Sequence, residues 1–165
     1  MTLVAANHGL VSADLSGRSA LAEKLEAVVP ESWPPDLYDR TAMGFALEEL
    51  EDSRMQGWSF WYLVLTDSNE LAGICGFKGR PDQAGSVEIG YSILSQYRGM
   101  GLATEAAMRL IAWAFTHRDV LEVSAETFPH LKSSIRVLEK NGMELRGRGS
   151  EPGVVRYAVA RPDRS

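Results

Sequence analysis

Apolar and polar residues alternate along several short segments of the chain, which is the pattern of β-strands with one buried face. The clearest example is 87–93, where Glu88, Gly90 and Ser92 separate four apolar residues. The same pattern predicts further strands at 1–6, 59–66, 71–78, 121–127, 143–148 and 154–159.

Apolar residues spaced three to four apart predict helices instead. This spacing occurs at 14–29, 36–55, 102–115 and 133–141. Pro30 and Gly142 end the first and last of these helices, and Asp36 is expected to cap the second, which runs to about residue 55.

The order of the elements predicts how the strands pair. Strands 59–66 and 71–78 flank the turn-forming tetrad Asp67-Ser68-Asn69-Glu70, so they form a hairpin. The strand at 87–93, the helix after it and the strand at 121–127 form a right-handed crossover with parallel strands. We therefore expect an α/β fold with a mixed, mainly antiparallel sheet and helices on its faces.

Composition limits the kind of protein. The chain has 165 residues, of which 45% are hydrophobic, which fits one domain over residues 1–165. Its 17 basic and 22 acidic residues give a net charge of -5, which argues against nucleic-acid binding and suits a cationic partner. No apolar run approaches the roughly 20 residues of a membrane span, and no signal segment is visible, so we expect a cytoplasmic protein.

Cysteine and histidine usage offers little chemistry. Cys75 is the single cysteine and lies in a strand-like run, so we expect a buried core residue rather than a nucleophile. His8, His117 and His130 have no ligand spacing to one another or to Cys75. We therefore expect no metal site.

The most informative stretch is 95–106, which places Gly99 and Gly101 between a strand and the first turn of a helix. That turn carries unpaired backbone N–H groups and the positive end of the helix dipole, and glycine lets an anion approach closely. A phosphate fits such a loop, although many strand-to-helix turns need glycine for steric reasons alone. A dinucleotide fingerprint would need a third glycine, and a Walker loop would need Gly-Lys-Ser/Thr.

Written as Arg98-x-x-Gly101-x-Ala103, this stretch resembles the Q/R-x-x-G-x-G/A signature of the GNAT acyl-CoA N-acyltransferases. With 87–91 and 134–143 it resembles the RimJ/RimL-like branch of that superfamily. The resemblance implies a GNAT fold with splayed central parallel strands and acetyl-CoA as cosubstrate. It also implies a coenzyme site made by Tyr91, Ser92, Ile93, Arg98, Gly99, Met100, Gly101, Leu102, Ala103 and Thr104.

The same resemblance suggests catalytic groups. Glu88 becomes the candidate general base or water-positioning residue, and Glu126 on the next strand is a second candidate. Without the resemblance, both carboxylates would be read as solvated groups on a strand face. Ser134 could contact the thiol sulfur, although a serine at a helix start is often only a cap.

Two positions depart from the family pattern. Leu138 stands where many members carry a tyrosine, and Leu131 replaces an asparagine that usually opens this helix. Ser134 or a water molecule would then protonate the leaving thiolate, or coenzyme A would leave without a specific acid.

The acceptor side is predicted from the segment between the first two helices, which lines the acceptor site in GNAT proteins. Glu31, Trp33 and Asp36 are therefore candidates for binding a cationic, partly apolar amine, although Trp33 could equally be a packing residue. We expect direct transfer of acetyl to a primary amine, with a protein or peptide N-terminal α-amine as acceptor. The alternatives are a small-amine acetyltransferase and a non-catalytic acyl-CoA-binding or interaction module. A homodimer is an analogy with relatives.

Overall fold

The computed structural model describes residues 1–163, which form two compact units. The first unit contains Met1–Gly76 and Tyr91–Leu102. The second contains Phe77–Gly90 and the chain from Ala103 onward. Two segments of the chain therefore build each unit.

The first unit contains three strands of the sheet and the end of a fourth, in the order β1-β2-β3-β4. β1 (Thr2–Ala5) pairs antiparallel with β2 (Phe60–Val64), and β2 pairs antiparallel with β3 (Leu71–Phe77). The end of β4 (Ser86–Ile93) joins β3 through the Leu94 N–H, which donates to the Ala72 carbonyl at 2.8 Å. The predicted hairpin between the second and third strands is confirmed.

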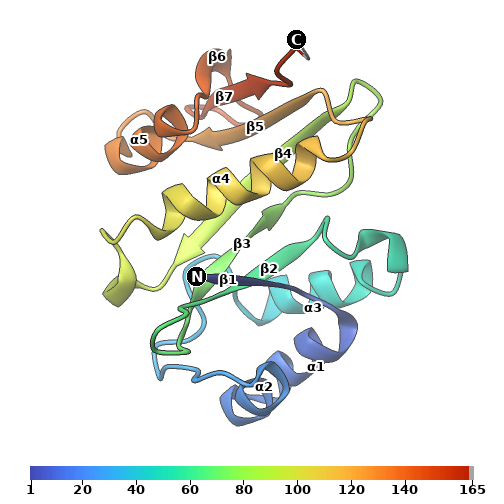
Figure 1. The fold of residues 1–165 in the computed structure, drawn as a ribbon, viewed down its shortest axis with the longest axis vertical. Coiled ribbons are helices and arrows are strands. Elements are labelled where there is room, and N and C mark those ends of the chain that lie inside the picture. The colour runs from blue at the N-terminus through green and yellow to red at the C-terminus, as the bar shows by residue number, and fades with distance from the viewer. Residues whose placement is uncertain (164–165) are drawn as a thin grey trace. The chain divides into compact units, whose positions relative to one another are not determined.

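Three helices lie next to β1 and β2 in this unit (Figure 1). They are α1 (His8–Ser16), α2 (Arg18–Leu25) and α3 (Arg40–Glu49), and η1 (Ser53–Met55) follows as a single 3-10 turn. The prediction of one helix over 14–29 was wrong, because Gly17 has a φ of 134° and separates α1 from α2.

The prediction that Asp36 caps the next helix was also wrong. Leu37 has a φ of 68°, a left-handed conformation from which a right-handed helix cannot start. The helix begins at Arg40 instead, where the Asp39 side chain accepts a hydrogen bond from the Ala42 N–H at 2.9 Å.

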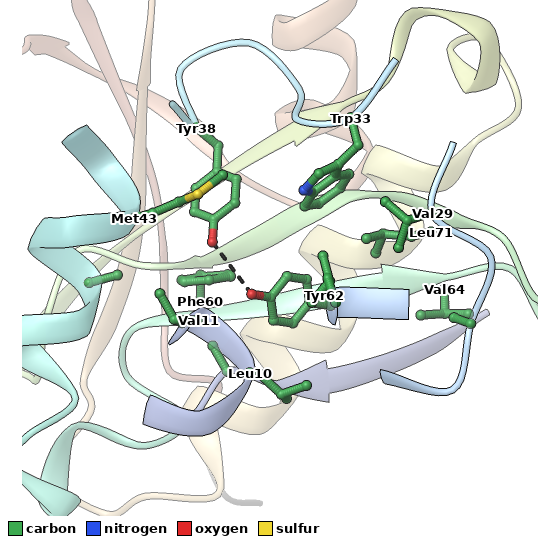
Figure 2. Packing of buried hydrophobic residues seen from close by; sticks show 14 of the residues in the cluster. Leu10, Val11, Val29, Trp33, Tyr38, Met43, Phe60, Tyr62, Val64 and Leu71 are labelled. Carbon is green, nitrogen blue, oxygen red and sulfur yellow. Dashed lines mark hydrogen bonds between the residues drawn. The ribbon is translucent and has the colours of Figure 1, made fainter. Parts of the chain in front are cut away.

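The core of the first unit surrounds a buried carboxylate. Asp14 is 6% exposed and accepts hydrogen bonds from Trp33 Nε1 at 2.9 Å, Tyr38 OH at 2.9 Å and Tyr62 OH at 3.0 Å. Figure 2 shows Trp33 and Tyr38 pointing from the 30–39 loop toward Tyr62 on β2. Cys75 is buried as expected, and burial raises the pKa of its thiol to about 12.

The second unit contains the first half of β4 and three further strands, in the order β4-β5-β7-β6. β5 (Glu122–Thr127) pairs parallel with β4 and antiparallel with β7 (Val155–Ala160), which pairs antiparallel with β6 (Glu144–Arg148). The predicted parallel pair and the mixed, mainly antiparallel sheet are confirmed.

The parallel register in this unit covers three residue pairs, from Ser86↔Glu122 to Glu88↔Ser124. The helices are α4 (Leu102–Phe115), nearly all of which belongs to this unit, and α5 (Lys132–Lys140), which packs beside β5 (Figure 1). None of the helices in residues 1–163 combines the length and apolar composition that crossing a bilayer requires.

Candidate active site

The glycine loop, residues 98–104, follows the 3-10 turn η2 (Ser95–Tyr97) and enters α4. Gly99 and Gly101 both have a φ of 78°, a left-handed conformation that costs other residues about 1–2 kcal/mol. A Cβ placed on either glycine would meet no described heavy atom within 4 Å. Backbone conformation therefore requires glycine here, and the open space on both glycines leaves the backbone accessible to a ligand.

The first turn of α4 carries N–H groups without intrahelical partners and the positive end of the helix dipole. Asn141, at the end of α5, holds this turn: its Nδ2 donates to the Thr104 carbonyl at 3.2 Å and to the Val137 carbonyl at 2.8 Å. Sequence reasoning missed Asn141, because its partner on α4 lies 37 residues away along the chain.

Arg98 connects the glycine loop to two other segments of the first unit. Its Nε donates to the Ile93 carbonyl at 3.2 Å, and its guanidinium pairs with the Asp36 carboxylate at 3.1 Å. The Ser92 hydroxyl also donates to the Asp36 carbonyl at 2.6 Å. The structure thus brings four predicted residues together: the coenzyme candidates Ser92, Ile93 and Arg98, and the acceptor candidate Asp36.

The other acceptor candidates, Trp33 and Glu31, have different surroundings. Trp33 is 6% exposed and packs against Tyr38 and Tyr62, with ring centroids 5.9 and 6.1 Å away. Its indole N–H donates to Asp14, so the packing role of Trp33 explains its position in this structure. Glu31 is exposed on the same loop.

Glu88 pairs with a cation that directly follows β3. The backbone N–H of Lys78 donates to the backbone carbonyl of Glu88 at 2.9 Å, and the side-chain Nζ of Lys78 contacts Oε2 of Glu88. That oxygen is itself inaccessible to solvent, whereas the Lys78 side chain is 66% exposed. Sequence reasoning missed Lys78, although antiparallel pairing of the consecutive predicted strands 71–78 and 87–93 could have placed it opposite Glu88.

Glu126 is occupied by different contacts. It lies two residues beyond Ser124, the register partner of Glu88. Its two carboxylate oxygens accept from Ser150, from the N–H at 2.8 Å and from the hydroxyl at 2.7 Å. These bonds give Glu126 a structural role next to the β6–β7 connection.

The start of α5 holds the third catalytic candidate. Ser134 is the third residue of this helix and is partly buried. Leu131 occupies the N-terminal capping position, where its hydrocarbon side chain accepts no hydrogen bond from the helix. Leu138 is 1% exposed, so this position brings no polar group to the surface.

These features can be compared with known proteins. The model of the acetyltransferase (GNAT) domain family matches residues 13–144, which include parts of both units. An uncharacterized N-acetyltransferase of Bacillus subtilis strain 168, YjdG, is 30% identical over 119 residues, covering 72% of this chain and 71% of that protein.

Solved structures share the fold at low sequence identity. RimL, a ribosomal L7/L12 alpha-N-protein acetyltransferase in complex with coenzyme A, superposes with a TM-score of 0.66 at 19% identity, over 96% of this chain and 92% of its own. A variant of spermidine N-acetyltransferase SpeG from Vibrio cholerae also gives 0.66, at 15% identity, over 97% and 95%. The expected GNAT fold is confirmed. The chain therefore belongs to the GNAT acetyltransferase family and is an acyl-CoA-dependent N-acetyltransferase.

Proposed function

We propose that this enzyme transfers acetyl from acetyl-CoA to the N-terminal α-amine of a protein or peptide, as a member of the RimJ/RimL-like branch whose two units act as one GNAT domain. The amine nitrogen attacks the thioester carbonyl directly in a ternary complex. The new N–C bond forms as the C–S bond breaks, the amine loses a proton, and the departing thiolate of coenzyme A gains one.

The coenzyme is assigned to the glycine loop and the end of β4. The backbone from Gly99 to Thr104 would bind the pyrophosphate, supported by the open left-handed glycines and the start of α4. The backbone of Tyr91, Ser92 and Ile93 would meet pantetheine and polarise the thioester carbonyl. RimL, which shares the fold, is in complex with coenzyme A, and this supports acetyl-CoA as the cosubstrate. Ser134 or a water molecule protonates the thiolate.

The contact between Lys78 and Glu88 carries the assignment of the acceptor. Oε2 of Glu88 is sheltered from solvent and already holds one primary ammonium, that of Lys78. Because the Lys78 side chain is largely exposed, it can leave, and the ammonium of an acceptor can take its place. Glu88 would then accept the proton that the amine must lose, directly or through water.

An α-amine suits a site in which Glu88 is the one group assigned to accept the proton of the acceptor. Its pKa is near 8, against about 10.4 for lysine, so at about pH 7.5 roughly a quarter of α-amines are already unprotonated, compared with about one lysine in a thousand. RimL acts on a protein α-amine and SpeG on spermidine, so the fold accommodates both classes of acceptor. The lower proton affinity of the α-amine decides our choice.

The test of Glu88 is the Glu88→Gln variant, assayed with peptides and acetyl-CoA. We expect kcat/KM to fall by about 100-fold, the usual contribution of a general base, while the Kd for coenzyme A stays within about twofold. Glu126→Gln is the matched control and should lower kcat/KM far less, because Ser150 occupies its oxygens. An unchanged rate in Glu88→Gln would exclude Glu88 as the base.

The acceptor class is tested by mass spectrometry on three acceptors: a peptide with a free α-amine, the same peptide blocked at its N-terminus but carrying a lysine, and spermidine. We expect acetylation of the first alone. Acetylation of spermidine but of neither peptide would replace the α-amine proposal with a small-amine activity.

A further inference from the structure

Leu37 combines two unfavourable properties. Its φ is 68°, and its side chain is 94% exposed. Glu26 and Asn69 also have left-handed φ values, but Glu26 is the C-terminal cap of α2, and asparagine tolerates this conformation between β2 and β3. Neither explanation applies to a leucine in the 30–39 loop.

The neighbours of Leu37 impose this conformation. On one side, the Asp36 carbonyl accepts the 2.6 Å hydrogen bond from Ser92, and the Asp36 carboxylate pairs with Arg98. On the other side, Tyr38 is 3% exposed, and its hydroxyl donates to Asp14 at 2.9 Å. Because both neighbours are held, Leu37 keeps a strained backbone and points its side chain into solvent.

The position of Leu37 relates it to the reacting groups. Ser92 is assigned to the thioester in the proposed function, and it bonds directly to the residue before Leu37. Standard bond lengths added to that 2.6 Å hydrogen bond place the Leu37 Cα at most about 8 Å from the Ser92 Cα. If the backbone of Ser92 binds the thioester, as the proposed function assigns it, the acceptor would attack near residue 37, whose side chain is exposed.

We propose that Leu37 determines acceptor specificity by contacting an apolar side chain at the first or second residue of the substrate N-terminus. This inference rests on the proposed function and narrows it to N-termini that begin with aliphatic or aromatic residues. The contact would remove the leucine and its partner from water together, and burial of this apolar surface would favour binding. A hydroxyl-rich or polycationic amine offers no such partner.

The experiment compares two peptides that differ only in leucine or serine at the first residue. The variant Leu37→Asn keeps a residue that tolerates the left-handed backbone but removes the apolar contact. The control is Phe45→Gln, which removes another exposed apolar side chain of the first unit, 65% exposed on α3. Acetyl-CoA consumption gives kcat/KM for each pair, and sedimentation velocity gives the oligomeric state.

For the unmodified enzyme we expect kcat/KM to favour the leucine peptide by about tenfold. Leu37→Asn should reduce this preference to about twofold or less, through loss on the leucine peptide alone, and raise Tm by about 2–4 °C because strain is relieved. Phe45→Gln should keep the preference. The inference is overturned if Leu37→Asn retains the preference, or if it slows both peptides equally while changing the oligomeric state.

A second pair of acceptors separates this inference from the proposed function. Hexylamine and an ethoxy-ethanolamine of similar length differ as the two peptides do, because the first carries an apolar chain and the second a polar one. If only these amines are acetylated, the α-amine proposal fails, and the effect of Leu37→Asn on their ratio decides the role of Leu37. If no peptide and no amine is acetylated, both proposals fall.

Discussion

Among single residues, Asp14 makes the largest demand on the structure. A buried carboxylate loses its hydration, and here three neutral donors, Trp33, Tyr38 and Tyr62, replace the lost water. These donors come from the 30–39 loop and from β2, so one carboxylate joins α1 to both. The position of that loop, and with it Asp36 and Leu37, depends on Asp14.

We therefore expect Asp14→Ala to destabilise the protein by at least about 3 kcal/mol, because it leaves three buried donors without an acceptor. For a chain of this size, Tm should fall by about 10 °C. Asp14→Asn keeps one acceptor and nearly the same volume, so its effect should be smaller. Glu23→Ala, at an exposed position on α2, is the control. Equal melting temperatures for Asp14→Ala and the unmodified protein would contradict this role.

The same carboxylate predicts a pH dependence. Burial raises the pKa of Asp14 above its usual value, against the opposing effect of its hydrogen bonds, so the folded state binds the proton more tightly than the unfolded state. Its contribution to stability is then complete below about pH 4 and declines as the pH rises through the folded pKa. In urea unfolding, the advantage of the unmodified protein over Asp14→Asn should shrink from about pH 4 to about pH 7. A constant difference would show that the pKa is not raised.

Sequence reasoning identified site residues that belong to a local motif and missed those defined by distant partners. Gly99 and Gly101 were recognisable because the strand, the loop and the helix follow one another directly. Asp14 was not, because its three partners lie 19 to 48 residues away, and only the tertiary structure brings them together. Lys78 lies between these cases, because finding its partner Glu88 requires only the pairing of two consecutive strands.

At the scale of elements, the period of the hydrophobic pattern located the strands well. Each predicted strand agrees with the structure within one or two residues, because alternation shows directly which side chains are buried. The helices of the first unit were harder. The break between α1 and α2 and the late start of α3 depend on the backbone conformations of Gly17 and Leu37, which apolar spacing does not report.

The link between the 30–39 loop and the glycine loop gives a prediction at this scale. The Asp36 carboxylate pairs with Arg98, the first residue of the loop assigned to an anionic coenzyme. Removing this negative charge with Asp36→Asn should lower the Kd for coenzyme A by about threefold at low salt and by less at high salt. Isothermal titration calorimetry with coenzyme A at low and at high salt measures the change in Kd under each condition.

The control for this prediction is the Arg98→Gln background. If Asp36 acts by holding the guanidinium away from the coenzyme, Asp36→Asn should bring little further gain once Arg98 is replaced. A Kd that rises in Asp36→Asn would mean that the carboxylate orients Arg98 for binding rather than competing for it.

For the whole molecule, the most direct prediction is stabilisation by the coenzyme. A ligand at about a hundred times its Kd stabilises the folded state by roughly 2.7 kcal/mol, which raises Tm by about 5–10 °C at this size. Thermal unfolding with and without acetyl-CoA measures this shift. A cooperative transition that does not move would show that the glycine loop is structural.

A matched pair of glycine variants tests whether the Tm shift with acetyl-CoA depends on the glycine loop. Gly101 and Gly153 have φ values of 78° and 81°, and a Cβ on either meets no described atom within 4 Å. Gly101→Val and Gly153→Val should therefore cost similar backbone strain, while only Gly101→Val should abolish the shift with acetyl-CoA. Loss of the shift in both variants would contradict a binding role specific to Gly101.

The division of the chain also has a consequence for biosynthesis. The first unit closes with Tyr91–Leu102, which follows an excursion of the chain through the second unit. On the ribosome, Met1–Gly76 emerges long before the end of β4 can pair with β3, so the nascent chain presents an unpaired strand edge during that interval. Ser92 and Arg98 arrive with this last segment, and their bonds to Asp36 form only then. The segment that shields a vulnerable edge during translation is thus the one that leads into the glycine loop.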